Sequence, residues 1–346
     1  MRDYKISVII PTFNRSQLLR SSLESLVAQT MSPTDFEVIV VDDGSTDKTY
    51  SVCKEFVARL SLKYIPIENS GISAAKNMGV FISSAPVLFF FDDDDIADPN
   101  LLEEHLRAHE VYPDESVAVL GRTMWHPKLN VTEVMAFATE VGCVLFSYTK
   151  IKENEFHGFK LFWGGRLSCK RSFLTSHGIF NQKFRFGYED IELGYRLSRF
   201  GLRVVYNKNA VQFMNRAITL EQLGRRVKKQ GASKFIFGQL HPDPLIQDYC
   251  QIEESNSKLV NLSKDLDFEL LKVEKLESEI LASNHKKTAQ ALRLELHECY
   301  RHSLNLYELE GFVEAKLSQL PMLKRLPIKT SSFLATMRGY FETRHN

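Results

Sequence analysis

Four consecutive aspartates, residues 92–95, follow directly on the apolar run 87–91. Neighbouring carboxylates repel one another strongly in a low-dielectric cleft, so they cost stability unless a cation neutralises them. Mg²⁺ and Mn²⁺ prefer oxygen ligands and leave coordination positions open for the oxygens of a diphosphate. The run therefore predicts a metal–diphosphate site, and a solvated acidic loop at the surface is the alternative.

A second polar segment, Pro-Thr-Phe-Asn-Arg at residues 11–15, lies between an apolar run and a predicted helix. The first turn of a helix presents unpaired N–H groups and partial positive charge, which suit a diphosphate. An ordinary strand-to-helix turn, with Asn14 or Ser16 capping the helix, is the alternative explanation of the same residues.

A third segment, Asp-Asp-Gly-Ser-Thr-Asp at residues 42–47, follows the apolar run 38–41. A carboxylate fixed at the end of a strand can accept hydrogen bonds from a pyrimidine N–H or from ribose hydroxyls. The same residue types also form turns and helix caps. We expect both roles, with Asp42 facing a ligand and Ser45 or Asp47 shaping the turn.

A fourth segment, Phe-Gly-Tyr-Glu-Asp-Ile-Glu-Leu at residues 186–193, precedes the helical stretch 194–200. A carboxylate at the start of a helix is well placed to act as a general base for an incoming hydroxyl. Capping of the helix by Asp190 is the alternative.

The elements between these segments predict an α/β fold. Short β-branched and aromatic runs at 7–10, 38–41, 63–65 and 87–91 alternate with amphipathic stretches such as 15–30. This alternation is typical of parallel strands joined by crossover helices. Ligands of open α/β sheets collect at the carboxyl ends of the strands, where the polar segments stand, so the placement predicts a binding cleft.

The composition changes beyond the segment His-Pro-Asp-Pro at 241–244, where the prolines break regular structure. We therefore expect one domain over residues 1–243 and a C-terminal helical domain over residues 244–346. Apolar residues in the second domain follow heptad spacing, and a second helical stretch spans about 288–309. The heptad residues are Leu259, Leu262, Leu266, Val273, Leu276 and Ile280. A helical hairpin is expected, packed on the main domain or on a second copy of the chain.

The composition of the 346 residues, 44% hydrophobic and 25% charged, is that of an ordinary globular protein. A formal net charge of +1 gives no bulk field for a nucleic-acid backbone, so no nucleic-acid partner is expected. The five cysteines are scattered without a CxxC pair, which is typical of reduced thiols. The first apolar run is too short for a signal peptide. We expect a cytoplasmic protein, soluble or peripheral at the cytoplasmic face of a membrane.

Taken in order, these segments resemble the family 2 glycosyltransferases of the GT-A fold, over residues 6 to about 242. The segments that carry the resemblance are 7–15, 40–47, 71–77 (Gly-Ile-Ser-Ala-Ala-Lys-Asn), 92–95 with Pro99 beyond, 164–165, the region of Phe180, and 189–193. The resemblance implies an inverting enzyme. An acceptor hydroxyl would attack the anomeric carbon of a nucleotide sugar, and a nucleoside diphosphate, expected to be UDP, would leave.

The resemblance also implies residue roles around the donor. The residues expected to border the nucleotide are Pro11, Thr12, Asn14, Arg15, Asp42, Asp43, Lys76 and Asp93. Asp42 would read the base. Asp92 and Asp94 would form the DxD pair that holds Mn²⁺ or Mg²⁺ together with the donor.

On the acceptor side, the resemblance implies that Asp190 is the general base, with Glu189 beside it. The residues expected at the donor or acceptor sugar are Trp163, Gly164 and Gly165. An indole can stack on a sugar face, although burial in a core is the alternative for Trp163.

Two departures from the resemblance bear on donor and metal binding. Lys76 stands where relatives commonly carry Arg, and Lys lacks the planar bidentate fork of a guanidinium. Residues 211–215 offer no His where relatives often carry a third metal ligand. The missing histidine and the long helical tail make a non-catalytic nucleotide-sugar-binding module one alternative function, against which the acidic run and Asp190 argue. A sugar nucleotidyltransferase is another, but it would be expected to carry a Gly-rich basic signature after the first strand.

The partners follow from the same reasoning. The acceptor would be a glycan, a lipid-linked molecule or a protein. The apolar stripe of the C-terminal helices must find a partner, which could be the second helix of the same chain, a second subunit, or a membrane surface approached through residues 320–340. We predict self-association through these helices ahead of lipid contact.

Overall fold

The computed structural model describes residues 3–258, 266–282 and 286–319, and it divides them into two compact units. The first unit comprises the described residues up to Val131 together with Phe146–Ala217. The second comprises Thr132–Leu145 and the described residues from Ile218 onward. Each unit has its own core, and they are described separately.

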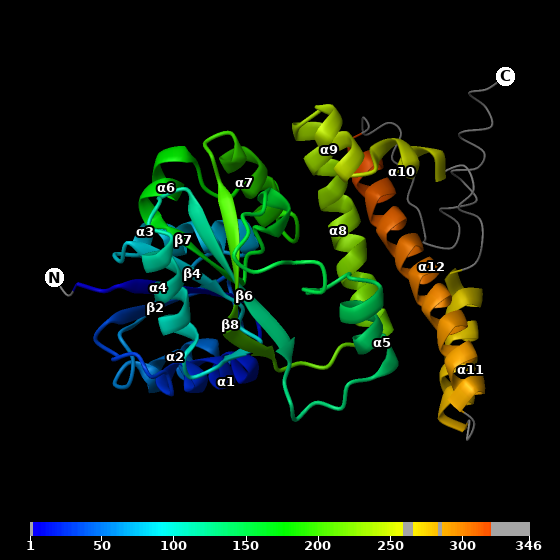
Figure 1. The fold of residues 1–346 in the computed structure, drawn as a ribbon, viewed down its shortest axis with the longest axis horizontal. Helices are drawn as coiled ribbons and strands as arrows, with labels where there is room; N and C mark the ends of the chain where they lie inside the picture. Colours follow the sequence, from blue (N-terminus) through cyan, green and yellow to red (C-terminus); the bar gives the residue numbers. More distant parts are fainter. Residues whose placement is uncertain (1–2, 259–265, 283–285, 320–346) are drawn as a thin grey trace. The chain divides into compact units, whose positions relative to one another are not determined.

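The first unit is built from strands and helices that alternate along the chain (Figure 1). Its strands are β1 (Ile6–Thr12), β2 (Phe36–Asp42), β3 (Leu62–Pro66), β4 (Val87–Phe91), β5 (Asp95–Ala97), β6 (Val117–Trp125), β7 (Arg166–Lys170) and β8 (Arg203–Met214). Its helices are α1 (Ser16–Val27), α2 (Thr49–Phe56), α3 (Ile72–Ile82), α4 (Leu101–Val111), α6 (Arg171–His177) and α7 (Glu189–Ser198), with a 3-10 turn at Phe159–Leu161.

The strands form one mixed sheet with the order β3-β2-β1-β4-β7-β6-β8-β5. The pairs β1–β2, β1–β4 and β2–β3 are parallel, as the alternation of strands and helices predicted. Strand β7 runs antiparallel to both β4 and β6, so the second half of the sheet is mixed. The register sets Thr12 opposite Asp42 at the carboxyl ends of β1 and β2.

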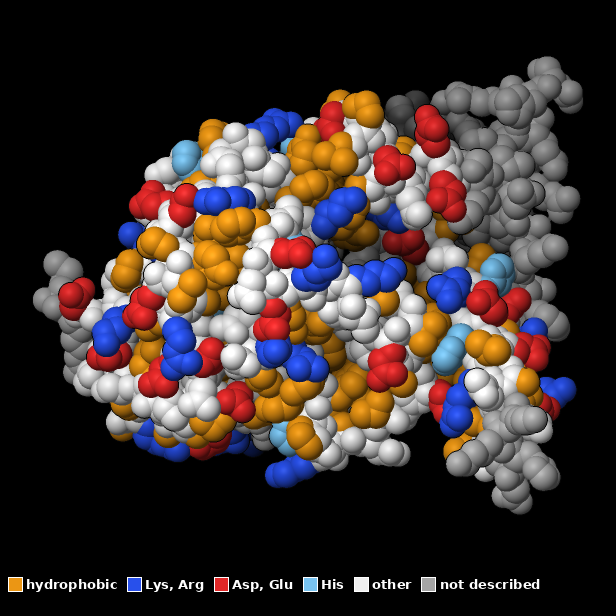
Figure 2. Space-filling view, viewed as in Figure 1, with side chains coloured by type: hydrophobic (Ala, Val, Ile, Leu, Met, Phe, Trp, Pro, Cys, Tyr) orange, Lys and Arg blue, Asp and Glu red, His pale blue; other side chains and the backbone are white. Residues whose placement is uncertain are grey.

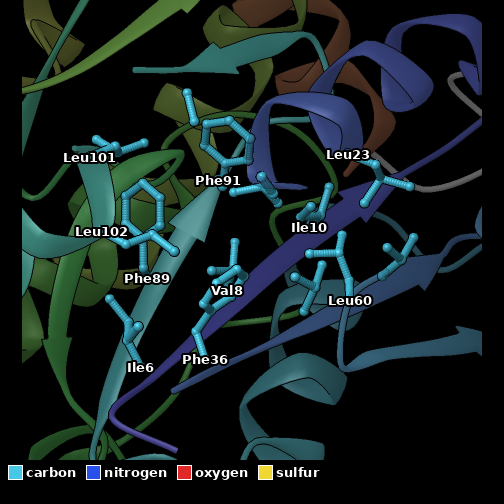
Figure 3. Close-up of a cluster of buried hydrophobic side chains, with 14 of the residues drawn as sticks. Ile6, Val8, Ile10, Leu23, Phe36, Leu60, Phe89, Phe91, Leu101 and Leu102 are labelled. Carbon is cyan, nitrogen blue, oxygen red and sulfur yellow. The ribbon is translucent and has the colours of Figure 1, made fainter. Parts of the chain in front are cut away.

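The main core lies between one face of the sheet and helices α1, α2 and α4. Alternate residues of β1, β2 and β4 point into it and meet the apolar faces of the three helices; Figure 3 shows Val8, Phe89 and Leu23 among them. Helix α3 covers the opposite face, where Ala75 packs against Ile39 and Val41. Burial on both faces explains why these strands are continuous apolar runs.

The second unit is helical. Its elements are α5 (Glu133–Ala136), a π-helix (Phe137–Val141), α8 (Leu220–Leu240), α9 (Pro244–Tyr249), α10 (Ile252–Lys258), α11 (Leu266–Ala282) and α12 (Lys286–Ser318). Residues 132–145 leave the first unit to join this one: the Phe137 ring lies 5.3 Å from Tyr300, and Arg293 forms a 2.8 Å ion pair with Glu133.

Helices α8 and α12 pack along each other at very short range. A side chain at Gly231 would collide with the backbone carbonyl of Glu308, and one at Gly311 would collide with the carbonyl of Lys228. Only glycine permits so close an approach of two backbones. Lys228 of α8 also forms ion pairs of 2.8 Å with Glu310 and Glu314 of α12, which add an electrostatic contact between the two helices.

The sequence placed the domain boundary at Asp243, whereas the structure places the division earlier, before α8. Pro244 does interrupt the helical path, because it starts α9 behind the N-cap Asp243. Helix α8, however, belongs with α12 through the glycine contacts above. Asp243 therefore marks a break between two helices of one unit.

The predicted hairpin of the C-terminal domain corresponds to α11 and α12. The heptad residues Val273, Leu276 and Ile280 are buried, as their spacing predicted. Leu259 and Leu262, and the predicted lipid-binding segment 320–340, lie outside the described residues. None of the helices in the described part of the chain combines the length and the apolarity needed to cross a bilayer.

Candidate active site

The polar segments meet at the carboxyl ends of β1, β2 and β4. Thr12 ends β1 and donates a 2.7 Å hydrogen bond to Asp93, in the loop that follows β4. Asp43 follows β2, and its N–H donates to the carbonyl of Thr12 at 2.9 Å. Three segments that are up to 81 residues apart in the chain are thus in direct contact.

The loops after β1 and β2 are tied to each other. The N–H of Asn14 donates to Ser45 Oγ at 2.8 Å, and the N–H of Thr46 donates to Asn14 Oδ1 at 2.8 Å. The carboxylate of Asp47 accepts from the N–H of Ser16 at 2.9 Å and so caps α1. The predicted capping of α1 by Asn14 or Ser16 is wrong, because the N-cap is Arg15, which makes no side-chain cap.

Asp42 and Asp43 are both buried and both shape the surrounding loops. Asp42 accepts from Tyr64 Oη at 2.6 Å and from the N–H of Ser45 at 2.8 Å. Asp43 accepts from the N–H groups of Ser70 and Gly71 at 2.7 and 2.9 Å. Burial and the neighbouring Asp42 carboxylate raise the pKa of Tyr64. Base reading by Asp42 stays a prediction, and the hydrogen bonds fix where its carboxylate stands.

Arginines of the protein pair with the two central carboxylates of the acidic run. Asp93 accepts from Arg15 Nη1 at 2.8 Å, in addition to its hydrogen bond from Thr12. Asp94 accepts from Arg216 Nε at 2.9 Å and from Arg15 Nη1 at 3.4 Å. Burial nevertheless raises the pKa of Asp93 to about 6, against the opposing effect of Arg15.

The outer two carboxylates of the run face β7 and β8. Arg166 Nη2 lies 3.5 Å from Asp92 Oδ2. Gln212 donates to Asp95 and to the carbonyl of Gly165, the latter at 2.8 Å. Gly165 has a φ of +110°, and a side chain there would collide with the carboxylate of Asp92. Glycine is therefore required where the segment between the 3-10 turn and β7 passes the acidic run.

Basic and acidic side chains are interspersed on the face shown in Figure 2. The ion pairs described above likewise place arginines beside aspartates at the ends of the strands. Arg166, Arg15 and Arg216 pair with Asp92, Asp93 and Asp94, so cations of the protein itself balance part of the acidic run that the sequence assigned to a metal. Arg166 and Arg216 gave no signal in the sequence, since they are 74 and 122 residues away from their partners.

A divalent cation would still find suitable ligands here. Asp92 and Asp94 present hard oxygen atoms. Among residues 3–258, 266–282 and 286–319, no group of three or more His, Cys, Asp or Glu side chains is arranged to hold a metal. An ion held by two protein carboxylates would complete its shell with diphosphate oxygens and water, and a metal at Asp92 and Asp94 stays a prediction.

The predicted base Asp190 lies in the first turn of α7, behind the N-cap Tyr188, whose φ is +63°. Its carboxylate accepts from the N–H of Gly164 at 2.8 Å and from the N–H of Ile191 at 2.8 Å. Burial and the neighbouring Glu189 raise the pKa of Asp190 to about 6, which Lys76 opposes. A carboxyl held in this range is suited to proton transfer near neutral pH.

Lys76 is enclosed rather than directed outward. Its side chain is 1% exposed, and Nζ donates to Glu189 Oε1 at 2.8 Å. The ammonium also lies 5.2 Å from the centre of the Phe180 ring. The predicted contact of Lys76 with a nucleotide stays a prediction; in the described structure this lysine supports the segment that carries Asp190.

The remaining predicted residues lie around these groups. Pro11 stands in β1 opposite Val41. Trp163 is half-buried, with its indole N–H donating to the carbonyl of Lys160 at 2.7 Å and its ring 5.8 Å from Tyr148. Contact of Trp163 with a sugar stays a prediction.

The fold and the convergent strand ends place the chain among open α/β proteins that bind ligands at the carboxyl edge of a sheet. Residues 7–158 match the family described as "Glycosyl transferase family 2". The chain is 30% identical to validoxylamine A glucosyltransferase of Streptomyces hygroscopicus subsp. limoneus, in an alignment covering 59% of this chain and 50% of that relative. Over residues 7–158 the chain belongs to glycosyl transferase family 2, and it is homologous to bacterial glycosyltransferases. It spans about half the length of this curated relative.

Solved structures support the fold assignment. The mannosyltransferase PcManGT from Pyrobaculum calidifontis, solved in complex with GDP-Man and Mn2+, superposes with a TM-score of 0.61 at 17% identity, over 92% of this chain and 88% of that chain. S. aureus TarS 1-349, in complex with UDP, superposes with a TM-score of 0.53 at 17% identity, over 94% of each chain. The predicted GT-A-like α/β fold with C-terminal helices is confirmed.

Proposed function

We propose that this chain is an inverting glycosyltransferase that moves a sugar from a nucleotide sugar, UDP-linked in the first instance, onto an acceptor hydroxyl. One observation carries the proposal: two consecutive glycines contact the proposed base on one side and the acidic run on the other. The N–H of Gly164 holds Asp190, while the bare backbone of Gly165 packs against Asp92. The base and the acidic run therefore face the same short segment.

The chemistry assigned to these residues is a direct displacement. Asp190 removes the proton from the acceptor hydroxyl as its oxygen forms a bond to the anomeric carbon. The bond between that carbon and the diphosphate oxygen breaks at the same time, and the nucleoside diphosphate leaves. Arg15 and Arg216, which are partly exposed at the acidic run, can face the negative charge of the leaving diphosphate.

Asp92 and Asp94 are the residues that would hold Mn²⁺ or Mg²⁺. Such an ion supplies Lewis-acid stabilisation of the leaving diphosphate. A relative in fold was solved with Mn2+ and GDP-Man, and another with UDP. These relatives support a nucleotide-sugar donor and leave open which base and which sugar this chain selects.

The function is tested by release of nucleoside diphosphate from UDP-glucose, UDP-N-acetylglucosamine and GDP-mannose, each with Mn²⁺ and with EDTA. We expect slow release from one donor in the presence of Mn²⁺ and much slower release from Asp190→Asn. Absence of release from every donor, with a folded protein, would refute the proposal and favour a binding module.

The partners beyond the donor stay predictions: a glycan, lipid-linked or protein acceptor, self-association through the C-terminal helices, and a place in the cytoplasm or at the cytoplasmic face of a membrane. The exposed leucines of α11 and α12, Leu271, Leu281 and Leu294, support self-association in the second unit.

A further inference from the structure

Arg216 holds the carboxylate that the proposed function assigns to the metal. It lies two residues beyond the end of β8, and its Nε donates to Asp94 Oδ2 at 2.9 Å. The N–H of the preceding Asn215 donates to the carbonyl of Asp94 at 2.8 Å. Backbone and side chain of Asp94 are thus both held by the segment after β8.

The same carboxylate oxygen also meets Arg15. Arg15 Nη1 lies 3.4 Å from Asp94 Oδ2 while it bonds Asp93 at 2.8 Å. The side chain of Asp94 is 7% exposed, whereas those of Arg15 and Arg216 are 40% and 26% exposed. A buried anion is therefore covered by two cations that reach solvent.

This arrangement opposes the binding of a bare divalent cation. An ion placed on Asp94 Oδ2 would stand close to two guanidinium groups, and like charges repel strongly where water is scarce. A diphosphate changes the balance, because its oxygens can accept hydrogen bonds from a guanidinium that has left a carboxylate. Arg15 pairs with Asp93 as well as with Asp94, whereas Arg216 pairs with Asp94, so a metal that takes over Asp94 releases Arg216 and leaves Arg15 its bond to Asp93.

We propose that Arg216 is the counter-ion of Asp94 in the absence of donor and turns to the donor diphosphate when Asp94 takes the metal. The proposal rests on the proposed function and adds a role for a residue outside the motifs. Arg216 thereby makes the affinity for the metal depend on the nucleotide. By linkage, the affinity for the nucleotide depends on the metal by the same factor.

A merely structural role for Arg216 predicts a different result. If Arg216 only stabilised the fold, its replacement would lower the thermal midpoint and leave the coupling between Mn²⁺ and UDP unchanged. The coupling factor, measured as the ratio of Mn²⁺ dissociation constants without and with UDP, therefore separates the two roles.

The experiment uses the full chain and Mn²⁺, with free Mn²⁺ followed by electron paramagnetic resonance and UDP binding followed by calorimetry. The variants are Arg216→Gln, Arg216→Met as a second uncharged replacement, and Arg216→Lys, which keeps the charge. Arg20→Gln is the matched control, because Arg20 pairs with Glu55 on the surface of α1, in the same unit.

We expect both uncharged variants to bind Mn²⁺ alone on the order of tenfold more tightly than the wild type, since one of two repelling charges is gone. Their coupling to UDP should fall by a similar factor. Arg216→Lys and Arg20→Gln should resemble the wild type.

Equal affinity of Arg216→Gln and wild type for Mn²⁺ alone would overturn the inference, and so would an equal gain in Arg20→Gln, which would indicate a bulk charge effect. Neither result touches the proposed function, whose separate readout is release of nucleoside diphosphate by the wild type. Absence of Mn²⁺ binding by every variant, with and without UDP, would overturn the inference together with the metal assignment.

Discussion

Replacement of Lys76 by methionine tests the support of the proposed base. Lys76 and Glu189 form a 2.8 Å ion pair with side chains 1% and 5% exposed, and Glu189 Oε2 has no hydrogen-bond partner. Lys76→Met keeps most of the volume and leaves an uncompensated buried charge, which costs about 3–5 kcal/mol. In a unit of about 200 residues, that loss lowers the thermal midpoint by roughly 6–20 °C.

The same substitution moves the ionisation of Asp190. Burial and Glu189 raise its pKa to about 6, and Lys76 works against that rise. Removal of Lys76 should therefore raise the pKa of Asp190 further. Because the base must be ionised, kcat/KM of the wild type should rise with pH and level off above about pH 6. The Lys76→Met profile should level off at a higher pH.

The pH dependence of stability has a defined sign. A carboxyl whose folded pKa lies above its unfolded pKa contributes stability that is present below the unfolded value and lost as the pH rises through the folded value. The deficit of Lys76→Met should therefore be larger at pH 7.5 than at pH 5, where Asp190 can take up a proton.

The assays are thermal unfolding at both pH values and a pH profile of kcat/KM. The double variant Lys76→Met/Glu189→Gln is the control, because it removes both charges and should recover most of the midpoint lost at pH 7.5. A single variant that melts within 2 °C of the wild type, or whose profile does not move, would refute the coupling of this ion pair to Asp190.

Three further predictions concern the base, the glycine turn and the C-terminal helices. Asp190→Asn should keep donor binding and lower kcat by roughly a hundredfold or more, which is the scale of general-base loss. Glu189→Gln should have a milder effect. If Glu189→Gln proves the more damaging in a transfer assay, the base is Glu189 and not Asp190. Gly165→Ala should lower the free energy of unfolding, measured by chemical denaturation, by at least about 2 kcal/mol, because it adds a side chain at positive φ against the acidic run. The same variant should weaken Mn²⁺-dependent UDP binding. Unchanged binding would show that this turn does not shape the site. The double variant Leu281→Glu/Leu294→Glu, at side chains that are exposed in the second unit, should lower the mass of the protein in light scattering without lowering its thermal midpoint, and a wild type that is already monomeric at micromolar concentration would contradict self-association.

The first half of the sheet could be predicted from the sequence because its signals are local. Strands β1, β2 and β4 are buried on both faces, so each is written as a continuous apolar run. The polar segments that follow them are correspondingly easy to place at one edge. The excursion of residues 132–145 into the second unit gave no such signal, since it depends on contacts of Phe137 with α12.

The sequence singled out the carboxylates together with Arg15 and Lys76, but it did not single out Arg166 and Arg216. Acidic residues stand next to one another in the chain, whereas Arg166 and Arg216 reach them only because β7 and β8 join the sheet by pairing with β4 and β5. The role of Lys76 is similar: its partner Glu189 is 113 residues away. Residue type and spacing along the chain reveal a cluster of like charges, but the groups that balance them are set by sheet order.

The glycine contacts between α8 and α12 fix how the two helices can slide. Gly231 of α8 contacts the backbone carbonyl of Glu308, and Gly311 of α12 contacts the backbone carbonyl of Lys228. In each helix, the glycine lies three residues after the residue whose carbonyl contacts the other helix's glycine. If the helices slid past each other by one turn, about 5.4 Å, each of these carbonyls would face a residue that carries a side chain in place of glycine. The pair of helices therefore has a single permitted register, and any change of length in this unit has to be absorbed away from the crossing.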